Sequence, residues 1–197
     1  MLDKDKITAD VTKAKQLADM VIVLPHWGTE YVYTPDSNQN YWTQLFLSLG
    51  VDVVIGTHPH VLEPVEVVSD TKGHEMLVYY SLGNFVSNQD QKPRMIGGMA
   101  KMTLVKDETG CYVKNYNLTP VITQKLFGKK AITTYKLSDY TESLASGNAI
   151  RNDSGCSDFS LSYCQTLVKQ ILGDDYDEST SELNVSLHPD GLGKDTS

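Results

Sequence analysis

The sequence predicts an α/β fold in which parallel strands are followed by antiparallel hairpins. Two short apolar runs bounded by Gly or Pro, residues 20–25 and 51–56, are typical of strands buried on both faces of a sheet. Each run comes directly after a segment with helical character, residues 8–19 and a second segment that ends at Gly50. Alternating helices and strands predict a parallel sheet with right-handed crossovers.

Both predicted helices carry boundary signals. Thr8 or Asp10 is a suitable N-cap for the first helix, because a short polar side chain can accept a hydrogen bond from a free backbone N–H. Asp36 or Ser37 offers the same cap to the second helix. Gly50 ends the second helix, since glycine tolerates the backbone conformation that follows a last helical turn.

The strand pattern after residue 60 predicts antiparallel pairing. Residues 61–68 and 75–80 are strand-like and flank a polar turn that contains a glycine. A second hairpin is expected from residues 98–105 and 111–121, which flank another polar turn with a glycine. The chain is therefore expected to pass from α/β units to a sheet of antiparallel strands.

Three parts are expected along the chain. Residues 1–134 hold the predicted strands and the first two helices. Residues 135–173 are interpreted as a helical appendage with helices at 137–146 and 157–172. Residues 174–197 are rich in Asp, Glu, Ser and Gly, which is the composition of an acidic, disordered tail.

Composition narrows the classes of function. With 197 residues of which 40% are hydrophobic, the chain can bury one core with an appendage. A formal net charge of -8 argues against a nucleic-acid surface, which needs clustered Lys and Arg. No stretch approaches the roughly 20 apolar residues of a membrane span, and the N-terminus lacks the apolar core of a signal peptide. The three scattered cysteines indicate neither a disulfide framework nor a thiolate zinc site.

Three histidines stand where the two predicted parallel strands end. His26 follows the first strand, and His58 and His60 follow the second. Ligands bind outside the carboxyl ends of the strands in open α/β sheets, so we expect the three imidazoles at one edge. On extended backbone, positions i and i+2 point to the same face, which predicts that His58 and His60 share a pocket. Neutral imidazole suits zinc, iron, manganese and copper.

Two polar residues near these histidines are candidates for catalytic roles. Glu30 could be a metal ligand, an acceptor that orients an imidazole, a general base, or simply a solvated loop residue. Asn84 follows Gly83 after the strand-like residues 75–80 and could contact a substrate or orient a ligand. The alternative for Asn84 is a turn residue that tolerates left-handed backbone.

Other charged residues have plainer interpretations. Arg94 either meets an anionic group or is a surface arginine. Glu63 and Glu66 are expected on a solvated face of the strand-like segment after His60. No role is expected for His74, in a predicted turn, or for His188, in the predicted tail.

Three motifs together resemble one known family. The motifs are His26-Trp-Gly-Thr-Glu30, Gly56-Thr-His-Pro-His60-Val-Leu-Glu-Pro-Val-Glu66 and Tyr80-Ser-Leu-Gly-Asn-Phe85. In order and spacing they resemble the bacterial capsule-synthesis CapA family of poly-γ-glutamate biosynthesis proteins, over roughly residues 8–125. The resemblance implies a calcineurin-like metallophosphoesterase fold, a four-layer α/β/β/α sandwich that is incomplete here.

The resemblance also implies a metal centre. Carried over by position, His26 and His58 would share one divalent ion (Mn, Zn or Fe), and His60 would serve a second. Family members begin with an N-terminal half whose Gly-Asp and Asn-His elements supply the remaining ligands, and no residue before His26 corresponds to them. The chain thus looks like the C-terminal part of a family member. The missing N-terminal half is an expected partner, and little catalysis is expected without it.

Three hypotheses about function follow. The first is a metal-dependent hydrolase or transferase in capsule synthesis, acting on a phosphoryl or amide centre. The second is a non-catalytic capsule-assembly protein that binds poly-γ-glutamate or another anionic substrate, with a cation as bridge between two acidic partners. The third is an inactive lobe that holds metal weakly by itself. The resemblance places such proteins outside the cell, at its surface or on the membrane.

Overall fold

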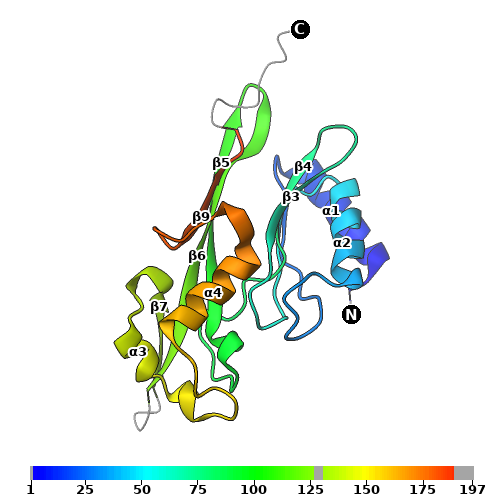
Figure 1. Ribbon diagram of the computed structural model, residues 1–197. Coiled ribbons are helices and arrows are strands. Elements are labelled where there is room, and N and C mark those ends of the chain that lie inside the picture. The colour runs from blue at the N-terminus through cyan, green and yellow to red at the C-terminus, as the bar shows by residue number, and fades with distance from the viewer. Residues whose placement is uncertain (1, 127–130, 189–197) are drawn as a thin grey trace.

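The computed structural model describes residues 2–126 and 131–188, which form two β-sheets and a helical layer. Helices α1 (Lys4–Leu17) and α2 (Ser37–Ser48) lie on one side of the first sheet, and the second sheet lies on the other side (Figure 1). Asp36 caps α2 as predicted, whereas Asp3 rather than Thr8 or Asp10 caps α1, which begins earlier than expected. The α/β class is confirmed.

The first sheet combines parallel and antiparallel strands in the order β1-β2-β4-β3. Strand β2 pairs in parallel with β1 and with β4, while β3 pairs antiparallel with β4, so both the parallel pairing and the first hairpin are confirmed. The regular strands are shorter than the apolar runs that predicted them. Their bounds are β1 Ile22–Val23, β2 Val53–Ile55, β3 Val65–Ser69 and β4 Glu75–Tyr79.

The second sheet is antiparallel and is organised around one long strand, β6. Its order is β5-β6-β9-β8, and β7 pairs with the last part of β6. The predicted hairpin of β5 and β6 is confirmed, although β6 runs five residues beyond its expected end at residue 121. The bounds are β5 Ile96–Asp107, β6 Gly110–Leu126, β7 Ala131–Lys136, β8 Tyr176–Asp177 and β9 Glu182–Ser186.

Part of the expected disordered tail is instead folded. Strand β9 pairs with β6, and β8 pairs with β9. Tyr176 and Leu183 are buried, so the tail contributes apolar side chains to the core despite its acidic composition. Glu182 and Asn184 form hydrogen bonds with the β6 side chain of Asn117, which accounts for polar residues between the buried ones. The rest of the expected tail, residues 189–197, lies outside the described residues.

The expected helical appendage is joined to the main core. The predicted helix over 137–146 is interrupted: a 3-10 turn, Leu137–Asp139, precedes α3 (Glu142–Ser146), which Thr141 caps. Helix α4 (Leu161–Leu172) begins after its cap, Ser160, and buries a stripe of residues spaced by four. Further 3-10 turns span Lys92–Met95, Ala149–Asn152 and Gly173–Asp175.

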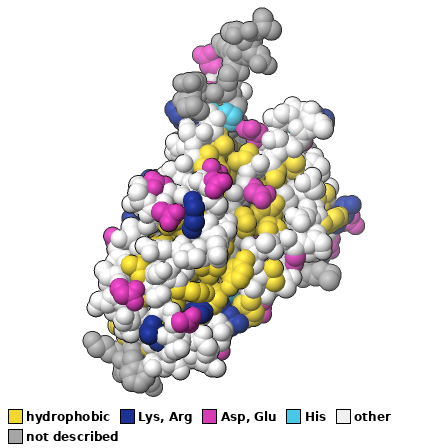
Figure 2. Space-filling view, in the orientation of Figure 1, with side chains coloured by type: hydrophobic (Ala, Val, Ile, Leu, Met, Phe, Trp, Pro, Cys, Tyr) yellow, Lys and Arg dark blue, Asp and Glu magenta, His cyan; other side chains and the backbone are white. Residues whose placement is uncertain are grey.

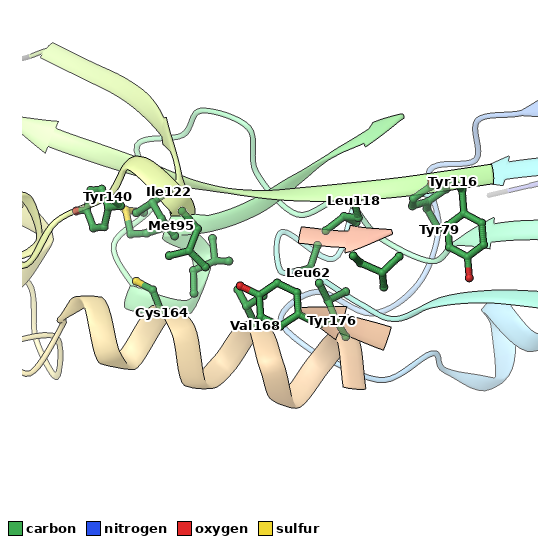
Figure 3. Packing of buried hydrophobic residues seen from close by; sticks show 14 of the residues in the cluster. Leu62, Tyr79, Met95, Tyr116, Leu118, Ile122, Tyr140, Cys164, Val168 and Tyr176 are labelled. Atoms are coloured by element: carbon green, nitrogen blue, oxygen red, sulfur yellow. The ribbon is translucent and has the colours of Figure 1, made fainter. Parts of the chain in front are cut away.

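Two apolar clusters hold the layers together. One packs α1 and α2 on the first sheet around Phe46 and Val54. The other joins the two sheets and α4: Figure 3 shows β6 side chains near Tyr79 of β4 at one end and above Val168 of α4 at the other. On the face shown in Figure 2, apolar side chains gather in a band between α4 and the α1–α2 layer, with acidic side chains around it. The described residues contain no helix long and apolar enough to cross a membrane.

Candidate metal centre

The candidate site lies where β1 and β2 end side by side. Pairing continues past the strands through a parallel bridge between His26 and Thr57. The Trp27 N–H donates to the Thr57 carbonyl at 3.1 Å, and the Thr57 N–H donates to the Pro25 carbonyl at 3.1 Å. Parallel neighbouring strands end at the same edge of a sheet, so the loops that follow β1 and β2 start close together. The two hydrogen bonds hold these loops next to each other.

The three histidines come together at this edge. The His26 and His58 ring centroids are 4.4 Å apart, and those of His58 and His60 are 6.1 Å apart. The expected extended backbone is wrong, since φ is 109° at His58 and 59° at His60. A bend therefore turns the two side chains toward one region. Positive φ is costly for residues with a side chain and is concentrated at functional sites.

Glu30 joins the same group from the loop after β1. One ligand atom from each of Glu30, His58 and His60 lies within 4.8 Å of the other two. The Oε1 of Glu30 is 3.8 Å from Nε2 of His60. Tyr31, with φ of 67°, turns this loop and donates its N–H to the Pro59 carbonyl at 2.8 Å, which holds Glu30 beside the histidine loop. Two imidazoles and a carboxylate are a donor set that fits a zinc, manganese or iron ion.

His26 lies at the same edge of the sheet, through its bridge to Thr57. It packs beside His58, but the set of mutually close donors found in the described residues contains Glu30 in its place. The role implied for His26, in which it shares one ion with His58 while His60 serves a second, stays a prediction.

Asn84 orients the imidazole of His60. Its Oδ1 lies 3.0 Å from Nδ1 of His60, and its Nδ2 donates to the backbone carbonyls of His60 at 3.0 Å and Arg94 at 3.1 Å. An amide oxygen only accepts hydrogen bonds, so this contact requires a proton on Nδ1. The Nε2 lone pair, on the side of Glu30, is then available to an ion. These hydrogen bonds restrain the ring of His60.

Comparisons with known proteins identify relatives of the segment that holds this site. Residues 2–89 match the profile of the bacterial capsule synthesis protein PGA_cap. This segment is therefore similar to the PGA_cap family. The chain is 36% identical over 111 residues to the PGA biosynthesis protein CapA of Bacillus subtilis (strain 168), covering 56% of this chain and 27% of that protein. It is 35% identical over 92 residues to the capsule biosynthesis protein CapA of Bacillus anthracis, covering 45% of this chain and 21% of that protein.

The comparisons confirm the CapA resemblance inferred from the three motifs. The PGA_cap match contains Glu30, His58, His60 and Asn84, whereas strands β5 to β9 lie beyond it. The aligned segments span about a quarter or less of the length of the curated relatives. The candidate metal centre therefore lies within the segment that matches the family model.

A buried carboxyl group lies within the second sequence motif, which spans residues 56–66. Glu63, expected on a solvated face, is instead 0% exposed. Its Oε2 accepts a hydrogen bond from Nε2 of Gln39 at 2.5 Å, while its Oε1 has no partner among the described residues. Burial raises the pKa of Glu63 to about 7, and the hydrogen bond from Gln39 offsets part of that effect. Gly28 packs against Gln39, so this pair supports the loop that carries Glu30.

The burial of Glu63 could not be inferred from the sequence, because a single acidic residue in a strand-like segment usually faces water. The available signal was its position directly after Val61 and Leu62, which are both buried. Glu66 is exposed, as expected. His74 contacts the Val51 carbonyl at 2.8 Å and His188 contacts Glu75 at 2.9 Å, both away from the candidate centre.

Proposed function

We propose that this chain acts in capsule (poly-γ-glutamate) synthesis through a divalent-metal site on a metallophosphoesterase-like fold. The observation that carries the proposal is the convergence of Glu30, His58 and His60 within 4.8 Å at the edge of a parallel sheet, inside the segment shared with the PGA_cap family. The matched relatives are named for capsule or PGA biosynthesis. The ion would be Mn, Zn or Fe, which imidazole and carboxylate ligands accept.

The proposed activity is that of a metal-dependent hydrolase or transferase. A bound ion would polarise a phosphoryl or amide oxygen and lower the pKa of a bound water. Asn84 would hold His60 in the tautomer that presents Nε2. Glu30 would complete the ligand set, and His26 would lie next to His58 at the same edge.

We further propose that the rest of a full-length family member completes this sheet. Within the described residues, β1 has a neighbour on only one side, and Leu24 beside it is 72% exposed. An open strand edge flanked by an exposed apolar side chain favours the addition of another strand. The aligned relatives are roughly four to five times longer than the matched segments, which leaves length for such strands. We expect catalysis to be weak without them.

A non-catalytic role in capsule assembly is the second candidate. The net charge of -8 would repel an anionic polymer, and a bound cation would bridge the two. We place either activity outside the cell or at its surface, where a capsule is assembled.

The proposed function predicts metal-dependent binding of poly-γ-glutamate. Titration of the 197-residue chain with a defined oligomer should show binding with Mn²⁺ or Zn²⁺ and none with EDTA, because the cation offsets the repulsion between two acidic molecules. His58→Ala should behave like the EDTA sample, and His74→Ala, outside the centre, should bind like wild type. Equal binding with and without metal would contradict the proposal. Release of new amine ends from the oligomer would favour the hydrolase over the assembly protein.

A further inference from the structure

We propose that an open cleft next to the metal centre is a carboxylate-binding subsite, in which Arg94 binds an acidic side chain of the polymer. The inference rests on the proposed function and names the part of the substrate that this cleft would hold. The cleft has a volume of about 620 Å³ and begins at His60 and Asn84. Polar side chains from the segment after β4 form much of its wall: Ser87, Asn88, Gln89 and Arg94.

Arg94 is held firmly, although the sequence allowed a simple surface arginine. Its side chain is only 18% exposed. The guanidinium carbon lies 3.5 Å from the centre of the Tyr31 ring, and that ring stacks beside His60 with centroids 6.2 Å apart. Stacking on an aromatic ring restrains a guanidinium while leaving its N–H groups at the edge free to bind. Arg94 is therefore preorganised beside the metal centre.

The guanidinium also has unused hydrogen-bonding capacity. Its Nη1 donates to Asp90 Oδ1 at 2.9 Å and to Gln89 Oε1 at 3.1 Å. Its Nε is buried without a partner among the described residues, so the donors open to a ligand are the N–H groups of the two Nη atoms. A guanidinium has five N–H donors in a planar fork, which matches the two oxygens of a carboxylate. The Asp90 side chain is 71% exposed, so its ion pair with Arg94 is weak and an incoming carboxylate can replace it.

The cleft and the metal centre form one rigid unit. Asn84 bonds to His60 through Oδ1 and to the Arg94 carbonyl through Nδ2. A Cβ atom added at Gly97 would lie 2.3 Å from the Asn84 carbonyl oxygen, which shows how closely β5 packs beneath this segment. The spacing between Arg94 and the donors Glu30, His58 and His60 is thus fixed. A ligand with repeated carboxylates can meet both at once, as poly-γ-glutamate would.

A carboxylate polymer needs a local positive site on this chain, because the chain as a whole repels anions. With a net charge of -8, the chain needs local positive groups to bind such a polymer. Arg94 and the ion would supply two such groups at neighbouring positions. Lys92 does not add a third, because its ammonium pairs with Asp158 at 2.5 Å and lies over the Tyr163 ring.

The test compares Arg94→Gln and Arg94→Lys with Lys92→Gln as the matched control. We expect Arg94→Gln to weaken binding of a metal-bridged poly-γ-glutamate oligomer by about tenfold or more, and Arg94→Lys by less, because lysine keeps the charge and loses the fork. Lys92→Gln should change it by less than about twofold, as expected for an exposed ion pair. Zinc affinity, measured separately, should be the same in all four proteins.

Further arms separate failure of the subsite from failure of the proposed function. Glutarate, a simple dicarboxylate, should bind in a manner that depends on Arg94, and inorganic phosphate should compete poorly. Arg94-dependent glutarate binding without any oligomer binding would keep the subsite and overturn the proposed function. Unchanged oligomer and glutarate binding in Arg94→Gln would overturn the subsite alone. A loss of zinc affinity in Arg94→Gln would also overturn the subsite, because Arg94 would then act on the structure of the metal centre. Strong competition by phosphate would overturn the assignment of the subsite to carboxylates.

Discussion

Gly56→Ala is expected to lower the free energy of unfolding by roughly 3–5 kcal/mol, the cost of overpacking together with a lost buried hydrogen bond. A Cβ atom at Gly56 would lie 2.0 Å from the Tyr80 carbonyl oxygen and 2.3 Å from Nε1 of Trp27. These two atoms are themselves joined by a buried hydrogen bond of 2.8 Å. Alanine would separate them and leave the indole N–H of Trp27 unpaired in the core.

Urea denaturation gives the measurement, and Gly147→Ala is the matched control. Gly147 has a negative φ, and the nearest atom to its added Cβ, the Ser143 carbonyl oxygen, is 3.4 Å away. We expect Gly147→Ala to change stability by less than about 1 kcal/mol, since surface substitutions without a clash have small effects. Equal losses of unfolding free energy in the two variants would show that Gly56 does not pack tightly against Trp27 and Tyr80.

Glu63→Gln is expected to remove a pH dependence of about 3 kcal/mol from the stability of the chain. Burial raises the pKa of Glu63 from 4.5 to about 7, so the native state binds this proton more tightly than the unfolded state. The stabilisation is complete below pH 4.5 and is lost as the pH rises to about 7. Glutamine resembles the neutral acid and can keep the contact with Gln39. The variant should therefore be the more stable protein at pH 8.

Denaturation at pH 5 and pH 8 checks this expectation, with Glu108→Gln as the control. Glu108 is exposed in the turn between β5 and β6, so its substitution should shift stability equally at both pH values. If the stability of wild type and of Glu63→Gln depends on pH in the same way, the pKa of Glu63 is not raised by burial in the native state. A wild-type stability that rises from pH 5 to pH 8 relative to the variant would contradict the sign.

The edge of the sheet could be predicted from sequence, but the shape of the site could not. Two buried apolar runs, each followed by histidine, were enough to place His26 and His58 at adjacent strand ends. The periodicity of a strand could not reveal that His58 and His60 lie on a bend with positive φ. Such backbone is set by contacts distant in sequence, as is the turn at Tyr31 that brings Glu30 to the histidines.

Other features depended on packing that no local pattern encodes. Glu63 is buried because Gln39 of α2 packs over it, and these residues are 24 positions apart. The buried residues of β8 and β9 were hidden by acidic and hydroxyl neighbours, which dominate the composition of a short window. The sequence could not indicate that the guanidinium of Arg94 lies against the ring of Tyr31, because the two residues are far apart along the chain.

Metal binding by the chain itself is the most direct test of the candidate centre. Purified wild type and the double variant His58→Ala/His60→Ala should be compared by isothermal titration with Zn²⁺ and Mn²⁺ and by elemental analysis, with His74→Ala as a control outside the centre. We expect a single ion per wild-type chain and a loss of affinity of at least about 100-fold in the double variant, because two of the imidazole ligands are removed. Equal metal content and affinity in wild type and double variant would contradict a metal centre formed by Glu30, His58 and His60.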